Sequence, residues 1–243
     1  MNCAIKTEAL TKRYKDTLAV DNLNLTVNEG EIFALLGING AGKTTTIKML
    51  TCLTKPTEGD AYLLGESIRE STKSVKSKIA VSPQETAIAK ALTVRENLEL
   101  MCGIYGFGKQ KQKKKCEELT RLLGLDSVIN KRAGKLSGGF QRRLSIAMAL
   151  ISEPKILFLD EPTLGLDVIA RSELWELVRA LRGSVTVVLT THYMEEAEAL
   201  SDRIAIMNEG KLIICDTAEN IKKAAGTDSF EEAFIRTVRG ARE

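Results

Sequence analysis

Two short segments hold residues whose types and spacing suit chemistry on phosphates: GINGAGKT at residues 37–44 and LSGGF at residues 136–140. In the first segment, glycines let successive backbone N–H groups converge on phosphate oxygens, while Lys43 adds positive charge and the Thr44 hydroxyl can reach Mg²⁺. This pattern predicts a phosphate-binding loop. In the second segment, Ser137 and small residues stand where a helix begins, so unpaired N–H groups and the positive end of the helix dipole face outward. It predicts a second anion site.

An acidic pair, Asp160 and Glu161, ends the apolar run LFLDE. Neighbouring side chains of an extended strand point to opposite faces, so the two carboxylates cannot share one role. One would hold Mg²⁺ directly or through water, and the other would polarise an attacking water. Together with the phosphate-binding loop, the pair favours nucleotide hydrolysis over the alternative of an exposed acidic pair without function.

The elements that must position these residues follow from apolar patterns. Alternating segments at 4–10 and 18–27, with a turn at 28–31, predict a small antiparallel sheet near the N-terminus. The continuous apolar run at 32–37 is typical of a strand buried on both faces, and it leads into the glycine loop and a helix over 43–52. The remaining predicted elements are turns around a short strand at 55–65, strands at 79–82, 156–160 and 185–190, a helix at 168–181 and a hairpin at 203–215. This alternation predicts a mostly parallel sheet.

From about residue 92 to residue 152 helical spacing replaces strand patterns, as in Val94, Leu98, Met101 and Ile104. We predict a helical subdomain over 87–152 that carries the second anion site. It interrupts a nucleotide-binding α/β core made of residues 1–86 and 153–216, and a helical tail follows over 217–243.

The composition is that of an ordinary cytosolic protein. Lys and Arg exceed Asp and Glu by 35 to 32, so the net charge of +3 gives no argument for nucleic acid. Five scattered cysteines without a CxxC pair suggest neither a disulfide framework nor a zinc site, and indicate a reducing compartment. No segment resembles a secretion signal or a membrane span, so we expect another subunit to supply any membrane part.

With these motifs, the chain resembles the nucleotide-binding subunit of ATP-binding cassette (ABC) transporters over nearly its whole length. The family's motifs occur in family order: Walker A at 37–44, the Q-loop at Gln84, the signature at 136–140, Walker B at 156–160 followed by Glu161, the D-loop at 164–167 and the switch histidine at His192. The resemblance implies a single ABC ATPase domain over 1–243. Its fold would be that of a RecA-like P-loop NTPase, with a mostly parallel α/β core, an N-terminal antiparallel sheet and an inserted helical subdomain.

The resemblance also implies roles for individual residues. Glu161 would be the base for water, His192 would report the γ-phosphate, and Gln84 would sense the metal and the attacking water. The implied metal ligands are Thr44, Gln84 and Asp160. The implied ATP-binding residues are Tyr14, which would stack on adenine, Gly37, Asn39, Gly40, Ala41, Gly42, Lys43, Thr44, Thr45, Ser137, Gly138 and Gly139.

Some positions have simpler interpretations or depart from the family pattern. Without the resemblance, His192 is a strand-end histidine and Tyr14 a half-buried strand residue. Phe140 stands where the signature commonly has Gln and Ile38 where Walker A commonly has Pro, while the D-loop reads LGLDV. The lysine run at 109–115 predicts a solvated loop or helix start, or a contact with anionic lipid headgroups.

The family relation further implies that two subunits, identical or different, meet head to tail, with each ATP between one Walker A and the opposite Ser137, Gly138 and Gly139. A separate transmembrane permease would be the other partner, on the cytoplasmic face of the membrane, with no nucleic acid involved. The stretches at 93–106 and 229–240 resemble the sodium-extrusion and multidrug-export branch, which predicts an exporter. The alternatives are a subunit that transmits force or regulates without transport, an ABC ATPase acting on ribosomes or DNA, and a small-molecule P-loop kinase.

Overall fold

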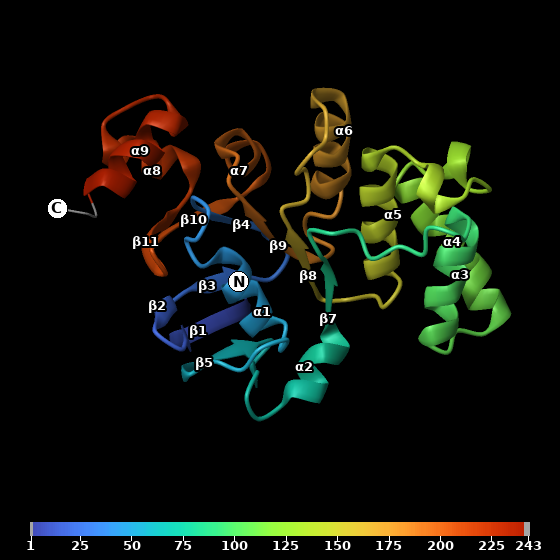
Figure 1. The fold of residues 1–243 in the computed structure, drawn as a ribbon, viewed down its shortest axis with the longest axis horizontal. Helices are drawn as coiled ribbons and strands as arrows, with labels where there is room; N and C mark the ends of the chain where they lie inside the picture. Colours follow the sequence, from blue (N-terminus) through green and yellow to red (C-terminus); the bar gives the residue numbers. More distant parts are fainter. Residues whose placement is uncertain (1, 241–243) are drawn as a thin grey trace.

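The computed structural model describes residues 2–240, and its strands form two sheets (Figure 1). The first sheet has five antiparallel strands in the order β2-β1-β5-β6, and β3 also pairs with β1. Its strands are β1 (Cys3–Tyr14), β2 (Thr17–Leu23), β3 (Thr26–Asn28), β5 (Glu58–Leu63) and β6 (Glu66–Ser67). The predicted antiparallel sheet is therefore confirmed, and β5 and β6 extend it.

The second sheet has six strands in the order β11-β10-β4-β9-β8-β7. They are β4 (Ile32–Leu36), β7 (Ile79–Ser82), β8 (Ile156–Asp160), β9 (Thr186–Thr191), β10 (Arg203–Asn208) and β11 (Lys211–Asp216). All neighbours are parallel except the β10–β11 hairpin. The parallel strands end at one edge, so the loops that follow β4, β7, β8 and β9 lie together there.

The core fills both faces of the second sheet, because side chains of its strands alternate between the faces. Phe33 and Phe158 are fully buried toward the first sheet, with α1 (Lys43–Leu50) in the same cluster. Leu36 and Leu189 point to the opposite face, toward the remaining helices. Burial of each such side chain contributes about 1.5–3 kcal/mol, which fixes the strands whose ends carry the site.

Three helices lie between β7 and β8 in the sequence and form the right-hand part of Figure 1. They are α3 (Val94–Ile104), α4 (Lys109–Leu122) and α5 (Gly138–Leu150), with short 3-10 turns at Asp126–Val128 and Ala133–Lys135. Thr93 and Glu96 form a capping box at the start of α3. The lysine run starts α4, in agreement with the helix-start interpretation, whereas the proposed subdomain boundaries stay a prediction.

The last helices are α6 (Val168–Arg179), α7 (Met194–Leu200), α8 (Ala218–Ala225) and α9 (Phe230–Gly240). They pack on the face of the second sheet opposite α1, where Leu174, Leu200 and Phe234 are buried. Across residues 2–240, none of the helices combines the length and the apolar character that a bilayer span requires.

Four details differ from the sequence prediction, and the first is α7, a helix of seven residues that no predicted element covers. The helix α2 (Thr72–Lys78) was not predicted, because it is polar and buries only Val75. The segment 18–27 forms two strands instead of one, because the strand is interrupted at Asn24 and Leu25 and β3 then pairs along a different part of β1. The turn at 28–31 connects β3 of the first sheet to β4 of the second sheet, so it does not join two strands of the antiparallel sheet.

Two of the five free cysteines lie together, contrary to the sequence impression of scattered thiols. The Sγ atoms of Cys102 on α3 and Cys116 on α4 are 3.9 Å apart and buried. Burial raises the pKa of the Cys116 thiol to about 12, so both remain protonated at neutral pH. They contribute to packing of the two helices.

Candidate nucleotide-binding site

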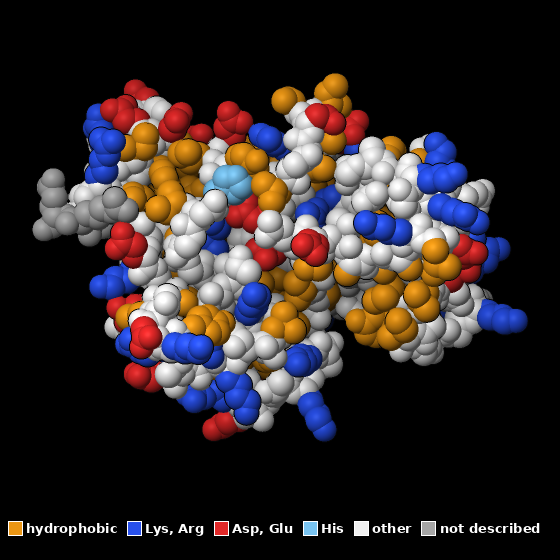
Figure 2. Space-filling model, in the orientation of Figure 1, with side chains coloured by type: hydrophobic (Ala, Val, Ile, Leu, Met, Phe, Trp, Pro, Cys, Tyr) orange, Lys and Arg blue, Asp and Glu red, His pale blue; other side chains and the backbone are white. Residues whose placement is uncertain are grey.

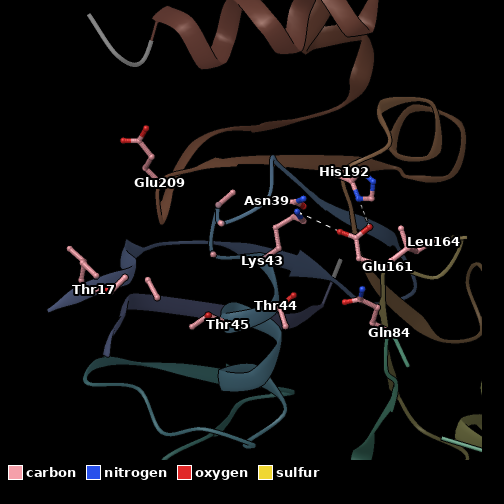
Figure 3. A pocket seen from close by; sticks show the side chains of 15 residues that line it. Thr17, Asn39, Lys43, Thr44, Thr45, Gln84, Glu161, Leu164, His192 and Glu209 are labelled. Carbon is pink, nitrogen blue, oxygen red and sulfur yellow. Dashed lines mark hydrogen bonds and ion pairs between the residues drawn. The ribbon is translucent and has the colours of Figure 1, made fainter. Parts of the chain in front are cut away.

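A cavity of about 700 Å³ opens at the carboxyl ends of β4 and β9 (Figure 3). Most of the predicted site residues line it, although they come from distant parts of the sequence. The lining residues are Thr17, Leu18, Ala19, Asn39, Gly40, Ala41, Gly42, Lys43, Thr44, Thr45, Gln84, Glu161, Leu164, His192 and Glu209. Strands β4 and β9 pair directly, which brings Lys43 and His192 to the same edge.

The phosphate-binding loop depends on two glycines that allow close backbone approach. Gly42 has a φ of 99°, and a Cβ there would lie 2.5 Å from the carbonyl oxygen of Ala19. A Cβ on Gly37 would lie 2.4 Å from the carbonyl oxygen of Met207. Helix α1 begins directly after Gly42 without a side-chain cap, so the N–H groups of its first turn have no partner within the helix. This end of α1 is therefore suited to an anion.

Lys43 is only 6% exposed, and its ammonium is held by oxygen atoms. Its Nζ donates to the carbonyl oxygens of Gly37 at 2.7 Å and Ile38 at 3.3 Å, and lies 3.5 Å from Oε1 of Glu161. Burial lowers the pKa of Lys43, while the Glu161 and Asp160 carboxylates act in the opposite direction. The cation thus lies at the floor of the site, held by two carbonyl oxygens and one carboxylate.

Glu161 follows β8 with a positive φ of 47°, a conformation that costs of order 1 kcal/mol or more in a residue other than glycine. Its backbone N–H donates to the Thr190 hydroxyl at 3.0 Å, which fixes this turn. As a result its side chain enters the cavity, where Oε1 faces Lys43 and Oε2 lies 2.8 Å from Nδ1 of His192 (Figure 3). Strained backbone of this kind recurs at functional sites.

Asp160 points elsewhere, as strand alternation predicted. Its Oδ1 accepts hydrogen bonds from the hydroxyls of Thr190 at 2.5 Å and Thr44 at 3.4 Å. The two carboxylates therefore have different neighbours: Asp160 has hydroxyls, and Glu161 has a lysine and a histidine.

The donor set around Thr44 fits Mg²⁺ bound together with a triphosphate. A hydroxyl and the Asp160 carboxylate are hard oxygen donors at one point of the cavity floor. Within residues 2–240, no group of three or more His, Cys, Asp and Glu side chains is arranged for a metal. The chain thus offers a partial oxygen shell, of the kind that Mg²⁺ completes with substrate phosphates and water.

Gln84 and His192 follow β7 and β9 and lie at the rim of the cavity. The Gln84 side chain is exposed, while its backbone carbonyl accepts a hydrogen bond from Arg142. The imidazole of His192 stacks near Tyr193, with ring centroids 4.1 Å apart. In the space-filling view the histidine lies at the surface beside acidic side chains (Figure 2).

The signature residues do not line this cavity. Ser137 caps α5 by accepting a hydrogen bond from the N–H of Phe140 at 3.5 Å, so the predicted helix start is confirmed. Ser137 and Gly138 are exposed, whereas Gly139 is buried and a Cβ there would lie 3.1 Å from Cβ of Ala170.

Tyr14 is likewise absent from the residues that line the cavity. It is the last residue of β1, is 43% exposed, and has Nζ of Lys12 5.0 Å from its ring centre. The residues closest to Tyr14 in the sequence that do line the cavity are 17–19. Its role in adenine stacking stays a prediction.

Sequence reasoning missed two buried charged residues behind the cavity, Arg142 and Glu196. Oε1 of Glu196 accepts a hydrogen bond from Nε1 of Trp175 at 3.2 Å, and Oε2 has no partner in residues 2–240. Burial raises the pKa of Glu196 against the opposing effect of the Thr191 and Thr163 hydroxyls. Helical spacing could have indicated their burial, because Arg142 and Glu196 lie on the faces of α5 and α7 that carry the apolar residues.

A glycine loop between a buried parallel strand and a helix, followed by an acidic pair at a neighbouring strand end, defines a P-loop nucleotide hydrolase. The family described as "ABC transporter" matches residues 20–164, which is more than half of the chain. The chain belongs to the ABC transporter family, as the resemblance implied.

Similar proteins agree with this assignment. The daunorubicin resistance ATP-binding protein DrrA2 of Streptomyces coeruleorubidus is 40% identical over 94% of this chain and 71% of its own length. The probable multidrug ABC transporter ATP-binding protein YbhF of Escherichia coli is 39% identical over 96% of this chain and 41% of its own length. A dimeric structure of a post-hydrolysis state of the ATP-binding cassette MJ0796, bound to ADP and Pi, superposes with a TM-score of 0.77 and 29% identity, over 88% of this chain and 98% of that one. The chain is thus an ATP-binding subunit with ATP hydrolase activity.

Proposed function

We propose that this chain powers an exporter by closing in pairs on ATP and acting on a separate transmembrane permease from the cytoplasmic face of the membrane. The observation that carries the proposal is the position of Glu161, a strained, buried carboxylate between Lys43 and His192 at the floor of an open cavity. A base so placed is ready for a water beside a phosphate that Lys43 binds.

In the proposed reaction, the triphosphate lies on the N–H groups of the loop and replaces the carbonyl oxygens of Gly37 and Ile38 around the Lys43 ammonium. Glu161 accepts the proton of the water that attacks the γ-phosphate, while the bond from the γ-phosphorus to the β–γ bridging oxygen breaks and ADP and phosphate are released. His192 orients Glu161 and contacts the γ-phosphate, and Gln84 contacts the attacking water. Thr44 and Asp160, with Gln84, would hold Mg²⁺, which neutralises charge on the phosphates.

The two-copy mechanism is supported by the exposed signature residues. Ser137 and Gly138 offer a hydroxyl and the free N–H groups of a helix start, yet they lie outside the cavity of their own chain. A second copy, related by a two-fold axis, would place them over the open side of the phosphates. The MJ0796 cassette is described as dimeric, which supports the pairing of two copies.

The proposal of an export partner has separate support. DrrA2 and YbhF are described as drug resistance and multidrug proteins, which favours export for a relative of this similarity. Leu100 and Ile104 on α3 and Tyr105 directly after it are 46%, 67% and 48% exposed, and apolar side chains gather near the lower end of that helix (Figure 2). Such a patch suits a contact with a membrane subunit.

The dependence of ATP hydrolysis on protein concentration tests the two-copy mechanism. With saturating ATP and Mg²⁺, the rate per chain is expected to rise with concentration and then level off, because two chains form each site. A rate per chain that stays constant from high dilution upward contradicts the two-copy mechanism.

The proposed membrane partner is tested by purifying the tagged chain from detergent-extracted membranes. We expect one multi-span protein at equal stoichiometry and ATP hydrolysis stimulated by the transported compound.

A further inference from the structure

Arg142 on α5 is 4% exposed, although arginine is rarely buried without partners. It lies five residues after Ser137, on the same helix as the signature residues. Nothing in the proposed reaction uses it.

The guanidinium of Arg142 binds the backbone where Gln84 enters the cavity. One nitrogen, Nη1, donates to the carbonyl oxygen of Pro83 at 2.5 Å, and Nη2 donates to the carbonyl oxygen of Gln84 at 2.6 Å. A planar fork of donors can bind two successive carbonyls in this way, whereas a lysine ammonium cannot hold both with the same geometry. The contact therefore fixes two consecutive backbone units, not a single point.

A second contact joins the same two elements one turn further along α5. The hydroxyls of Ser145 and Ser82 are buried and 2.9 Å apart. With Arg142, this hydrogen bond ties α5 to the end of β7 and to the segment that follows it. The start of α5, with its exposed signature residues, and the backbone of Gln84 are thus parts of one connected unit.

The charges around Arg142 explain why it stays in place. Burial lowers its pKa, and the Asp160 and Glu196 carboxylates oppose that effect. Asp160 also accepts the hydrogen bond of Thr44, so the arginine lies behind the proposed metal site. A neutral replacement would leave two carbonyls and two carboxylates without this cation.

We propose that Arg142 is a positioning residue that couples the signature corner to Gln84, so that a shift of α5 on dimer closure moves Gln84 relative to the attacking water. The inference rests on the proposed function for the role of Gln84. The contact itself can be tested without nucleotide.

Arg143 is the matched control, because it is the next residue on the same helix and bears the same group. It pairs with Glu173 on α6 and lies over the ring of Phe140 at 5.2 Å, so its partners differ from the Pro83 and Gln84 carbonyls that Arg142 binds. A general effect of removing an arginine from α5 would appear in both positions.

The first measurement is amide hydrogen exchange without nucleotide in R142K, R142Q and R143K. We expect about tenfold faster exchange of the bonded amides of Ala89 and Leu92 in R142Q, a smaller rise in R142K, and no change in R143K. Equal exchange in this segment for all variants overturns the proposal. Faster exchange that extends to β4 and β8 in R142K as well as R142Q also overturns it, because it indicates a role in stability alone.

The second measurement separates kcat from ATP affinity. R142Q is expected to lower kcat about tenfold with ATP affinity within twofold of wild type, and R142K is expected to restore part of the loss. Faster local exchange with unchanged kcat shows that the contact is real but does not position Gln84, which overturns the coupling. A wild-type chain without ATP hydrolysis refutes the proposed function instead, and the exchange result still reports on the contact.

Discussion

The two segments predicted to bind anions differ in how many contacts their polar groups already make within the chain. The loop before α1 ends in a buried lysine that already contacts two carbonyls and a carboxylate. The corner before α5 has an exposed serine whose hydroxyl makes only a long bond within its own helix. Under the proposed two-copy mechanism, a single chain would hold a complete phosphate-binding loop for one site and an unpaired signature corner for the other. ATP could then bind to one chain before two chains close on it.

The largest effect is expected from Glu161→Gln, which leaves the phosphate-binding loop intact but removes the base. Turnover should fall by about 10²–10⁴-fold, the usual contribution of a positioned base. ATP affinity should stay near wild type, and the two halves should remain closed on unhydrolysed ATP. Light scattering with ATP and Mg²⁺ checks this, and a variant that stays monomeric there would count against the pairing of the two segments.

Lys43→Ala should weaken ATP binding by the phosphate-binding loop and leave the signature corner unchanged. The loss of a charge-assisted contact to phosphate corresponds to about 1.5–3 kcal/mol, or roughly 10–150-fold in ATP affinity. Lys48→Ala is the control, because Lys48 is an exposed lysine on the same helix. Calorimetric titration of both variants measures the difference, and near wild-type affinity in Lys43→Ala would refute the assigned loop.

Ser137→Ala should impair the signature corner before α5. We expect about tenfold lower turnover and unchanged ATP affinity of the isolated chain. Loss of the helix cap adds about 1 kcal/mol of instability, so Ser137→Thr, which keeps the hydroxyl, is the control. Mixing Ser137→Ala with Lys43→Ala should recover activity above the sum of the two, because one intact site forms across the mixed pair. Recovery no greater than the sum would mean that the halves do not meet.

The smallest effect is expected for Glu196, which is buried behind the phosphate-binding loop, and it concerns thermal stability. Burial raises the folded-state pKa of Glu196 above its ordinary value of 4.5. The free energy of unfolding of the wild-type chain is therefore unaffected by this group below pH 4.5, and it falls as the pH rises through the folded-state pKa. Gln cannot ionise, and it retains an acceptor for Trp175. Glu196→Gln should thus raise Tm at pH 8 by a few degrees, given about 2–4 °C per kcal/mol, and the gain should vanish near pH 4.5. A gain independent of pH would exclude ionisation of Glu196 as its cause.

Sequence patterns predicted the elements whose signals are local. The continuous apolar runs became fully buried strands β4 and β8, and the glycine loop before Lys43 begins a helix as expected. Motif order then placed Gln84, Glu161 and His192 at one cavity, because each follows a parallel strand of the same sheet.

The rest depends on contacts between distant segments. The guanidinium of Arg142 reaches carbonyls 58 and 59 residues away, and no periodicity encodes that pairing. Cys102 and Cys116 meet only because α3 and α4 pack together. The positive φ of Glu161 was also beyond prediction, since glutamate has no preference for it and the hydrogen bond to Thr190 imposes it.

Trp175 is the only tryptophan of the chain, and its indole joins α6 to Glu196 on α7, the helix that begins two residues after His192. Indole emission responds to a change in hydrogen bonding and in nearby charge, so the unlabelled protein carries its own fluorescent reporter close to His192. Stopped-flow mixing with ATP can therefore time a change in the surroundings of α7 in the unmodified chain, without dye or added cysteine.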